Sequence, residues 1–185
     1  MLRKVYAKKL ESEIKKVPRH VVIVADKIER EKFLEFVDWV KKFKIKELTL
    51  CLKEKIEIEF SDLKAFVRVV DEKIFEFGKG DLIVNFVFFD GKREIANAFR
   101  KLAEKVLAGE IDPEKVNEEI IEEHLAIKSQ PDMIIKVGKE IPGFLIWQSI
   151  YSELFFADVD WKNFRYIDFL RMLREYQRRE RRYGR

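Results

Sequence analysis

Cysteine, histidine, proline and glycine are all scarce in this chain of 185 residues. The sequence has one cysteine, Cys51, and two histidines, together with seven glycines and four prolines. A single cysteine excludes an internal disulfide framework and a cysteine-rich zinc site, and it is typical of a protein in a reducing cytoplasm. The two histidines, His20 and His124, lie far apart and lack ligand partners at metal spacing. We therefore expect both to be structural residues.

Long hydrophobic runs and a large excess of one charge are also missing. The longest apolar runs, such as residues 83–89, fall well short of the roughly 20 residues that a membrane-spanning helix needs. Lys and Arg number 38 against 34 Asp and Glu, a net charge of only +4, so any basic function must be local. The sequence therefore predicts a soluble protein that touches at most the surface of a membrane. Charged residues of both signs make up 39% of the chain, which favours a thermophilic source.

What is present is an alternation of short apolar β-branched runs and longer amphipathic stretches. This order is typical of βαβ units that form a mostly parallel sheet flanked by helices. No linker, repeat or low-complexity tract divides the chain, so we expect one α/β domain over residues 1–185. Strands are expected at residues 21–24, 47–52, 82–88 and 133–135. Helices are expected at about 33–41, 61–77, 92–107, from 112 onward, 144–154 and 163–182.

The residues that follow the expected strands are candidates for a binding site. In open α/β sheets, ligands bind at the carboxyl ends of the strands. Lysines and acidic residues gather at these ends, in residues 25–27, 53–54, 90–92 and 136–140. This composition suits a diphosphate with magnesium, but polar residues follow any buried strand, so the pattern alone does not decide between a site and a plain surface.

The C-terminal third carries a more specific motif. It reads PDMIIKVGKE at residues 131–140 and FLIWQSIYSELFF at 144–156, followed by Asp158 and Trp161. Together with HVVIVAD at 20–26 and NFVFFDGKREI at 85–95, it resembles the cis-prenyltransferases, the undecaprenyl and dehydrodolichyl diphosphate synthase family. The resemblance implies an α/β fold, unlike the all-α fold of trans-prenyltransferases. It also implies synthesis of long-chain polyprenyl diphosphates, such as dolichol precursors, from isopentenyl diphosphate with magnesium.

The resemblance implies roles for particular residues. Asp26 and Glu153 match the two acidic residues that the family associates with magnesium. Lys136 and Lys139 lie in the stretch that binds the diphosphate of isopentenyl diphosphate. In this family an RxG triplet at the C-terminus completes the active site of the other subunit, and it corresponds here to Arg182 and Gly184, with Arg182 contacting the diphosphate. The interface residues implied for this dimer are Trp147, Ile150, Tyr151, Glu153 and Leu154.

Four departures from the family pattern lie on the substrate path. Most of the loop that wraps the allylic diphosphate is absent, since only 21 residues (27–47) separate Asp26 from Leu48 in the second strand. The SSENW hinge is replaced by residues 53–57, and the diphosphate-binding stretch at 136–143 lacks its second arginine and its serine. Residues 56–80 are short for the helices that line the family's hydrophobic tunnel.

These losses beside a preserved interface and tail resemble the non-catalytic accessory subunits of heteromeric cis-prenyltransferases, the Nogo-B receptor type. The resemblance then implies a catalytic cis-prenyltransferase as the partner, with little activity in this chain alone. Two alternatives stay open: a divergent but active homodimeric polyprenyl diphosphate synthase, and a lipid- or diphosphate-binding module.

The C-terminal segment is strongly basic. Residues 171–185 contain seven Arg and two Glu, a local charge of +5. Bidentate contact with a diphosphate, attraction to anionic lipid headgroups and the ordinary preference of a helix C-terminus for cations all fit this charge. Nucleic-acid binding is not expected, because no base-reading or stacking motif accompanies the arginines.

Overall fold

The structure is a computed structural model, and it describes residues 2–56, 59–71, 73–138 and 145–179. The strands are β1 (His20–Ala25), β2 (Glu47–Leu52), β3 (Phe66–Val70), β4 (Ile74–Phe77), β5 (Ile83–Val87), β6 (Met133–Val137) and β7 (Glu153–Ala157). The helices are α1 (Leu2–Glu13), α2 (Arg30–Lys42), α3 (Gly91–Leu107), α4 (Glu118–Glu123) and α5 (Tyr166–Arg178). Short 3-10 helices lie at Phe60–Leu63, Pro113–Lys115 and Trp161–Asn163.

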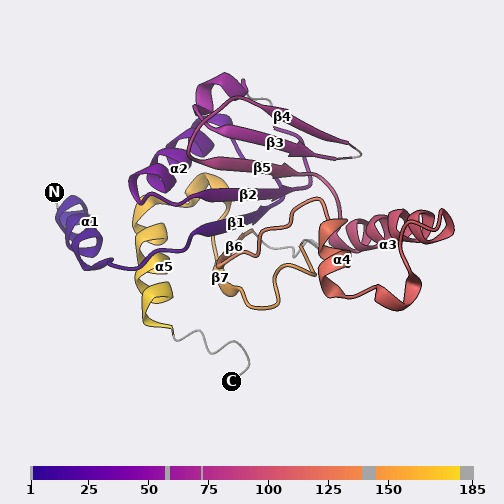
Figure 1. Cartoon of the computed structure of the whole chain (residues 1–185). Helices are drawn as coiled ribbons and strands as arrows, with labels where there is room; N and C mark the ends of the chain where they lie inside the picture. The colour runs from indigo at the N-terminus through magenta and orange to yellow at the C-terminus, as the bar shows by residue number, and fades with distance from the viewer. Residues whose placement is uncertain (1, 57–58, 72, 139–144, 180–185) are drawn as a thin grey trace.

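The strands form one sheet of seven, in the order β4-β3-β5-β2-β1-β6-β7 (Figure 1). Every neighbouring pair is parallel except β3 and β4. β1 lies inside the sheet between β2 and β6, and all six of its residues are buried. A continuous apolar run is typical of a strand covered on both faces. The predicted α/β fold with a mostly parallel sheet is confirmed, whereas the single domain over 1–185 stays a prediction.

Two apolar layers cover the sheet. The larger one joins the sheet to α2 and α5 through buried aromatic side chains, with ring centroids 5.0 Å apart for Phe36 and Phe169 and 5.5 Å apart for Phe33 and Phe86. The smaller one lies on the opposite face and contains Val24 and Leu145. Figure 1 shows α1, α2 and α5 on one side and α3 and α4 on the other. These phenylalanines therefore fill an ordinary core.

The helix expected over 61–77 is wrong. The 3-10 helix Phe60–Leu63 is followed by Lys64, whose φ of +43° cannot continue a helix, and the chain then forms the β3–β4 hairpin. Gly78, which directly follows the expected helix, lets two backbone segments approach each other, because a Cβ there would lie 2.6 Å from the carbonyl oxygen of Ala65.

The helix expected over 144–154 is also wrong in the part that the structure describes. Leu145 has a φ of +36°, residues 146–151 form turns, and β7 then pairs in parallel with β6. The Ser152 hydroxyl donates to the Pro131 carbonyl at 2.7 Å, and the Glu153 amide donates to the Asp132 carbonyl at 3.0 Å. These long-range bonds fix the segment as a sheet edge.

Other boundaries shift in smaller ways. The helix expected from residue 112 is split into the 3-10 helix Pro113–Lys115 and α4, whose N-cap is Asn117. The last helix begins at Tyr166, later than the expected residue 163, and residues 180–182 lie outside the described part. The N-terminal helix α1 was not predicted; it lies against α5, where Gln177 Nε2 donates to the carbonyl of Glu13 at 2.9 Å. Among the described helices, none has the length and hydrophobicity needed to span a bilayer.

Candidate active site

The carboxyl ends of β1, β2 and β6 bring Asp26, Lys53 and Gly138 together. The register pairs Ala25 with Leu52 and Val24 with Lys136. Asp26, Lys53 and Gly138 continue this register beyond the strand ends and therefore lie side by side. The backbone amides of Lys53 and Glu54 both donate to the carbonyl of Asp26 at 3.1 Å. The Lys53 ammonium then lies 3.4 Å from Asp26 Oδ1. The end of strand two, expected from the sequence to be polar, thus supplies a cation to the Asp26 carboxylate.

Asp26 offers one carboxylate to a metal ion. Its Oδ1 is buried and accepts no hydrogen bond from the described residues, although the side chain as a whole is 47% exposed. Magnesium needs near-octahedral oxygen coordination. Within the described ranges no group of three His, Cys, Asp or Glu side chains could hold a metal ion. Among the described residues Asp26 therefore offers magnesium a single carboxylate ligand, and Lys53 competes for the same oxygen.

Gly138 lies on the other side of this site, close to the Asp26 carboxylate. Its φ is +91°, and a Cβ added there would lie 3.7 Å from Asp26 Oδ2. The Gly138 amide donates to the carbonyl of Val159 at 3.2 Å, which fixes the chain as it leaves β6. Lys136 lies two residues earlier and is partly buried. The predicted substrate residue Lys136 is therefore near Asp26 in the sheet, whereas Lys139 lies outside the described residues.

Two other cations near these strand ends are already paired with carboxylates. Arg30, which follows Asp26 at the offset of a family arginine, contacts Asp62 through its guanidinium. Lys55 lies 2.9 Å from Asp71 Oδ2. Lys53 and Lys136 are the candidates to meet an anionic ligand beside Asp26, because they lie on or directly after the two strands that flank β1.

A family model described as "Putative undecaprenyl diphosphate synthase" matches residues 59–184, about two thirds of the chain. The chain belongs to this undecaprenyl diphosphate synthase family. It is 41% identical over 137 residues to a tritrans,polycis-undecaprenyl-diphosphate synthase (geranylgeranyl-diphosphate specific) of Methanocaldococcus jannaschii, covering 70% of this chain and 48% of the relative. It is 46% identical over 105 residues to an isoprenyl transferase of Thermus thermophilus, covering 52% of this chain and 40% of the relative. The chain thus spans about half the length, or less, of these curated relatives.

Solved structures share the fold. Lavandulyl diphosphate synthase from Lavandula x intermedia aligns with a TM-score of 0.72 at 19% identity, covering 91% of this chain and 99% of that one. A probable undecaprenyl diphosphate synthase from Campylobacter jejuni aligns with a TM-score of 0.72 at 21% identity, covering 92% and 100%. At these identities the likeness establishes the architecture alone.

In this chain the two residues predicted to bind magnesium, Asp26 and Glu153, are not neighbours. Glu153 begins β7 and pairs in register with Met133, the first residue of β6, whereas Asp26 stands beyond the far end of β1. Five residue steps along parallel strands separate their levels by about 16 Å. Glu153 instead accepts a hydrogen bond from Arg179 Nη1 at 2.9 Å, and the Arg179 guanidinium lies 4.3 Å from the ring centroid of Phe155. A metal-linked role for Glu153 stays a prediction.

Three of the five predicted interface residues are exposed apolar side chains, although not on a helix. Ile150 is 70% exposed, and Tyr151 and Leu154 are about half exposed. Trp147 is partly buried and donates from Nε1 to Glu122 Oε1 at 3.2 Å. We call this surface the β7 patch; its exposed members are Ile146, Ile150, Tyr151, Leu154 and Phe156. Arg182 and Gly184 lie outside the described residues.

A buried pair that sequence reasoning did not assign is Glu94 with Gln148. Glu94 Oε1 accepts hydrogen bonds from the amides of Ala126 at 3.0 Å and Ile127 at 3.4 Å, and Gln148 Nε2 lies 3.3 Å from both carboxylate oxygens. Burial raises the pKa of Glu94, and these hydrogen bonds oppose the rise. Both residues fall within motif stretches that carried the resemblance, which was the available signal. Their contacts tie α3 to the segments around residues 126 and 148.

A second polar network lies on the amino-terminal half of the sheet. A hydrogen bond of 2.8 Å joins His20 Nε2 to Thr49 Oγ1, and Asn85 Nδ2 donates to Thr49 Oγ1 at 2.9 Å and to Glu47 Oε1 at 2.7 Å. Burial lowers the pKa of His20, and the Glu47 carboxylate 3.9 Å away opposes this. The expectation that His20 is structural agrees with this placement.

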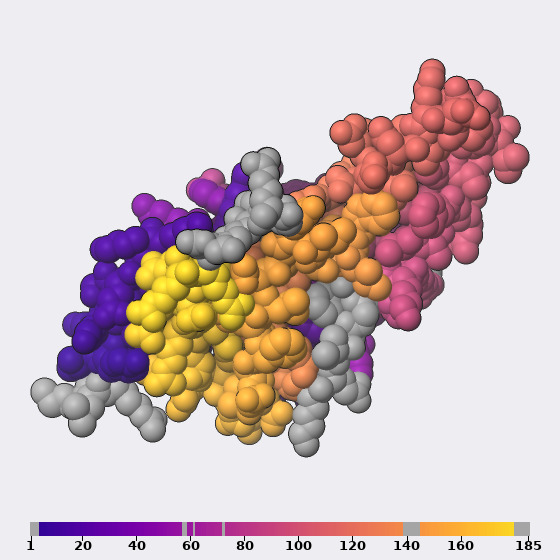
Figure 2. Space-filling model, turned by 90° about the horizontal axis from the view of Figure 1, so that it is seen from below, coloured from indigo at the N-terminus to yellow at the C-terminus, as the bar shows by residue number. Residues whose placement is uncertain are grey.

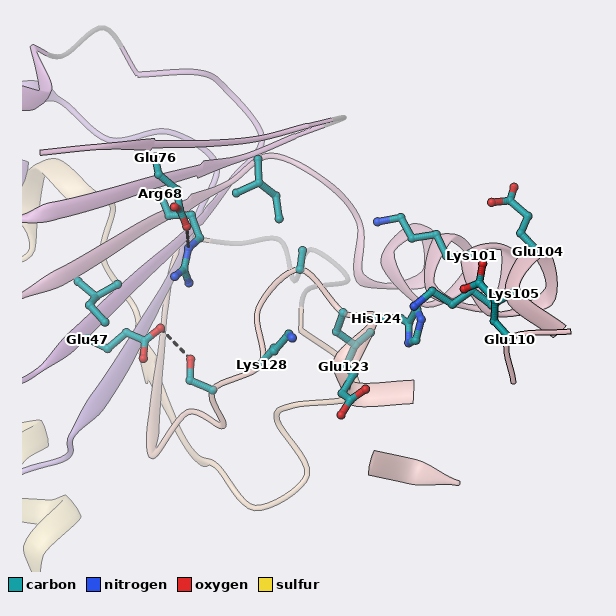
Figure 3. Close-up of a pocket in the computed structure, with 15 residues that line it drawn as sticks. Glu47, Arg68, Glu76, Lys101, Glu104, Lys105, Glu110, Glu123, His124 and Lys128 are labelled. Atoms are coloured by element: carbon teal, nitrogen blue, oxygen red, sulfur yellow. Dashed lines mark hydrogen bonds and ion pairs between the residues drawn. The ribbon is translucent and has the colours of Figure 1, made fainter. Parts of the chain in front are cut away.

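This network borders a cleft of about 1090 Å³ between the sheet and the α3–α4 region (Figure 3). Arg68 and Glu76 project into it from the sheet, while Lys101 and His124 face it from the opposite side (Figure 3). The lining thus combines charges of both signs. In the described part of residues 56–80, the β3–β4 hairpin occupies the position where the helices of the family's hydrophobic tunnel are expected.

Proposed function

We propose that this chain is a divergent polyprenyl diphosphate synthase that acts as a homodimer. It would condense isopentenyl diphosphate onto an allylic diphosphate. The observation that carries the proposal is its membership of the family together with more than 40% identity to relatives named as synthases or as an isoprenyl transferase. Several of those names specify geranylgeranyl diphosphate, which favours that molecule as the allylic substrate.

The strand-end site supplies the chemistry that this function needs. Lys53 and Lys136, with Lys139 as a further predicted contact, would neutralise the diphosphate groups, and Asp26 would hold magnesium. Bound magnesium would stabilise the negative charge that develops on the leaving diphosphate. The role of the protein is to place cations where that charge appears, in a site whose backbone is fixed by two hydrogen bonds from the amides of Lys53 and Glu54 to the Asp26 carbonyl.

A second copy of the chain would complete the site. Asp26 and Glu153 lie at opposite ends of the sheet, so one chain does not bring them together. Large exposed apolar patches often mark interaction sites in soluble proteins, and the β7 patch gathers five exposed apolar side chains. We propose that this patch pairs two copies about a two-fold axis, and that Arg182 and Gly184 of each copy reach the Asp26 site of the other.

The accessory-subunit function expected from the sequence is the second candidate. It is favoured by the Asp26–Lys53 ion pair and by the hairpin that stands where tunnel helices are expected. The names of the relatives, which describe a synthase and an isoprenyl transferase, favour the active enzyme instead.

Turnover by the purified chain separates the two candidates. With magnesium, geranylgeranyl diphosphate and radiolabelled isopentenyl diphosphate, we expect polyprenyl product from the chain alone and a loss of about 10²-fold or more in Asp26→Ala. Asp62→Ala, which removes the carboxylate paired with Arg30, is the matched control. An inactive chain that raises the activity of a catalytic homologue would establish the accessory role instead.

The tail proposal has its own variant pair. Arg182→Ala should lower activity on the order of 10²-fold, because it removes one charge-stabilising contact. Arg178→Ala changes an exposed arginine near the end of α5 and should have little effect. Equal losses in both variants would show that the tail acts only as a diffuse cationic surface.

A further inference from the structure

An apolar groove with a cationic rim lies between α1 and α5. Figure 2 shows these two helices side by side at one end of the molecule, α1 in indigo and α5 in yellow. The groove has a volume of about 570 Å³, and its lining is mostly apolar, with Tyr6 and Ile167 from the two helices. Lys4, Arg165 and Arg171 stand around it. None of these residues belongs to the candidate active site.

The acidic residues of α1 are turned toward the protein and paired. Glu11 lies 2.8 Å from the Lys42 ammonium, and Glu13 lies 3.6 Å from the Arg174 guanidinium. The lysines of α1, Lys4, Lys8 and Lys9, are exposed, and no acidic side chain in the described residues lies within 4.0 Å of their ammonium groups. The outer face of α1 therefore carries an excess of positive charge.

The helix α5 adds to this excess. Arg165 and Arg171 both contact Asp168, at 2.9 and 3.8 Å, so two guanidinium groups share one carboxylate. The Arg171 guanidinium also lies 5.7 Å from the centroid of the Tyr6 ring. The rim of the groove thus keeps a net positive charge beside an aromatic ring.

Apolar side chains protrude beside these cations. Val5 is 63% exposed, and Tyr6 is 37% exposed. A helix that presents lysines and an apolar side chain together is suited to the headgroup region of a membrane, where cations meet anionic lipids and apolar groups enter the acyl boundary. Neither a neutral membrane nor a soluble anion would engage both features.

We propose that this α1–α5 surface, defined by Lys4, Val5, Lys8, Lys9 and Arg171, docks the protein on an anionic membrane. The proposal is independent of the transfer activity, because it uses no residue of the Asp26 site. It places the membrane contact on α1 and the start of α5, in addition to any attraction by the basic C-terminal segment.

Sedimentation with lipid vesicles tests the proposal on the full chain. We expect binding to vesicles of phosphatidylcholine with phosphatidylglycerol, little binding to phosphatidylcholine alone, and release by added salt. The triple variant Lys4→Gln, Lys8→Gln, Lys9→Gln should weaken binding on the order of 10²-fold. Each lysine or arginine near an anionic membrane surface raises the binding affinity about 5-fold. Val5→Ser should weaken binding about 10-fold, because the variant has no apolar side chain at position 5 to transfer from water into the membrane.

A matched triple variant separates the docking surface from net charge. Lys73→Gln, Lys79→Gln, Lys115→Gln removes three exposed lysines elsewhere and should leave binding within about 2-fold of wild type. Circular dichroism confirms that each variant is folded. Equal weakening by both triple variants, equal binding to neutral vesicles, or no binding at low salt would overturn the proposal. Binding of a single-stranded oligonucleotide in place of vesicles, lost in the α1 variant, would overturn it in favour of a nucleic-acid surface.

Discussion

Removing the Glu94 carboxylate should destabilise the chain by about 3 kcal/mol. In Glu94→Ala the amides of Ala126 and Ile127 lose the acceptor that they share, while Gln148 Nε2 keeps its bond to the carbonyl of Ile127 at 2.7 Å. Each unsatisfied buried donor costs about 1–3 kcal/mol, and two donors are left. For a chain of this size the melting temperature should fall by about 6–12 °C.

Glu94→Gln is the informative partner variant. Gln148 Oε1 is buried and accepts no hydrogen bond from the described residues, so an amide at position 94 brings a donor to a site that lacks one. We expect this variant to lie within about 1 kcal/mol of wild type at neutral pH.

The pH dependence follows from the raised pKa of Glu94. The folded state favours the protonated carboxyl, so the stabilisation is complete below the ordinary pKa of 4.5 and is lost as the pH rises through the higher pKa of the folded state. The wild type should therefore lose stability relative to Glu94→Gln as the pH rises through that window.

Thermal unfolding followed by circular dichroism, from below pH 4.5 to neutral pH, measures both effects. Glu104→Gln, on the exposed side of α3, is the control and should follow the wild type. The reasoning fails if Glu94→Ala costs no more than this control, or if the difference between wild type and Glu94→Gln does not change with pH.

Two further predictions concern Cys51 and Gly138. Burial raises the pKa of the Cys51 thiol, so iodoacetamide should modify it at neutral pH only after denaturation, and labelling of the native protein would contradict its place in β2. Gly138→Ala and Gly109→Ala both force a side chain into left-handed backbone, at φ values of +91° and +73°, and each should cost about 1–2 kcal/mol in denaturant unfolding. Only Gly138→Ala should also weaken pyrophosphate binding, because its Cβ would lie beside Asp26 while nothing surrounds the one at Gly109.

The strands in the middle of the sheet were predictable because their apolar runs admit little else. β1, β2 and β5 are short and rich in apolar residues, and polar residues bound β1 and β2. Amphipathic spacing likewise located α2 and α3 closely. The local sequence was sufficient to predict an element where its apolar residues fitted only one period, that of a strand or that of a helix.

The structure of segment 61–77 was not predictable, because its apolar residues fit both the period of a helix and the period of a strand. Its apolar residues Leu63, Val67, Val70, Ile74 and Phe77 recur at helical spacing. The deciding interaction is the parallel pairing of β3 with β5, which lies far along the chain and is invisible to a local pattern. β7 was missed for the same reason, since its partner β6 fixes it as a strand.

The candidate site was only partly predictable. The rule that ligands lie at strand ends located Asp26, Lys53 and Lys136 from sequence. The contact between Asp26 and Lys53 depends on the exact register of β1 and β2 beyond their last paired residues, which no spacing reveals. The pairing of Glu94 with Gln148 likewise needs the path of the chain between them.

The strength of the Asp26–Lys53 ion pair bears on whether the departures from the family's sequence pattern imply loss of prenyl-transfer activity. Both side chains are almost half exposed, at 47% and 46%, and pairs of this kind contribute about 0–1 kcal/mol. A diphosphate that brings magnesium offers Asp26 a divalent cation and offers the Lys53 ammonium phosphate oxygens in exchange, so the ion pair is a weak barrier to binding. The ammonium that lies against the carboxylate without substrate is then available as a diphosphate contact when substrate binds. A lysine in this position is therefore compatible with an active synthase, because it can give the allylic diphosphate a cationic partner although most of the family's loop around that diphosphate is absent.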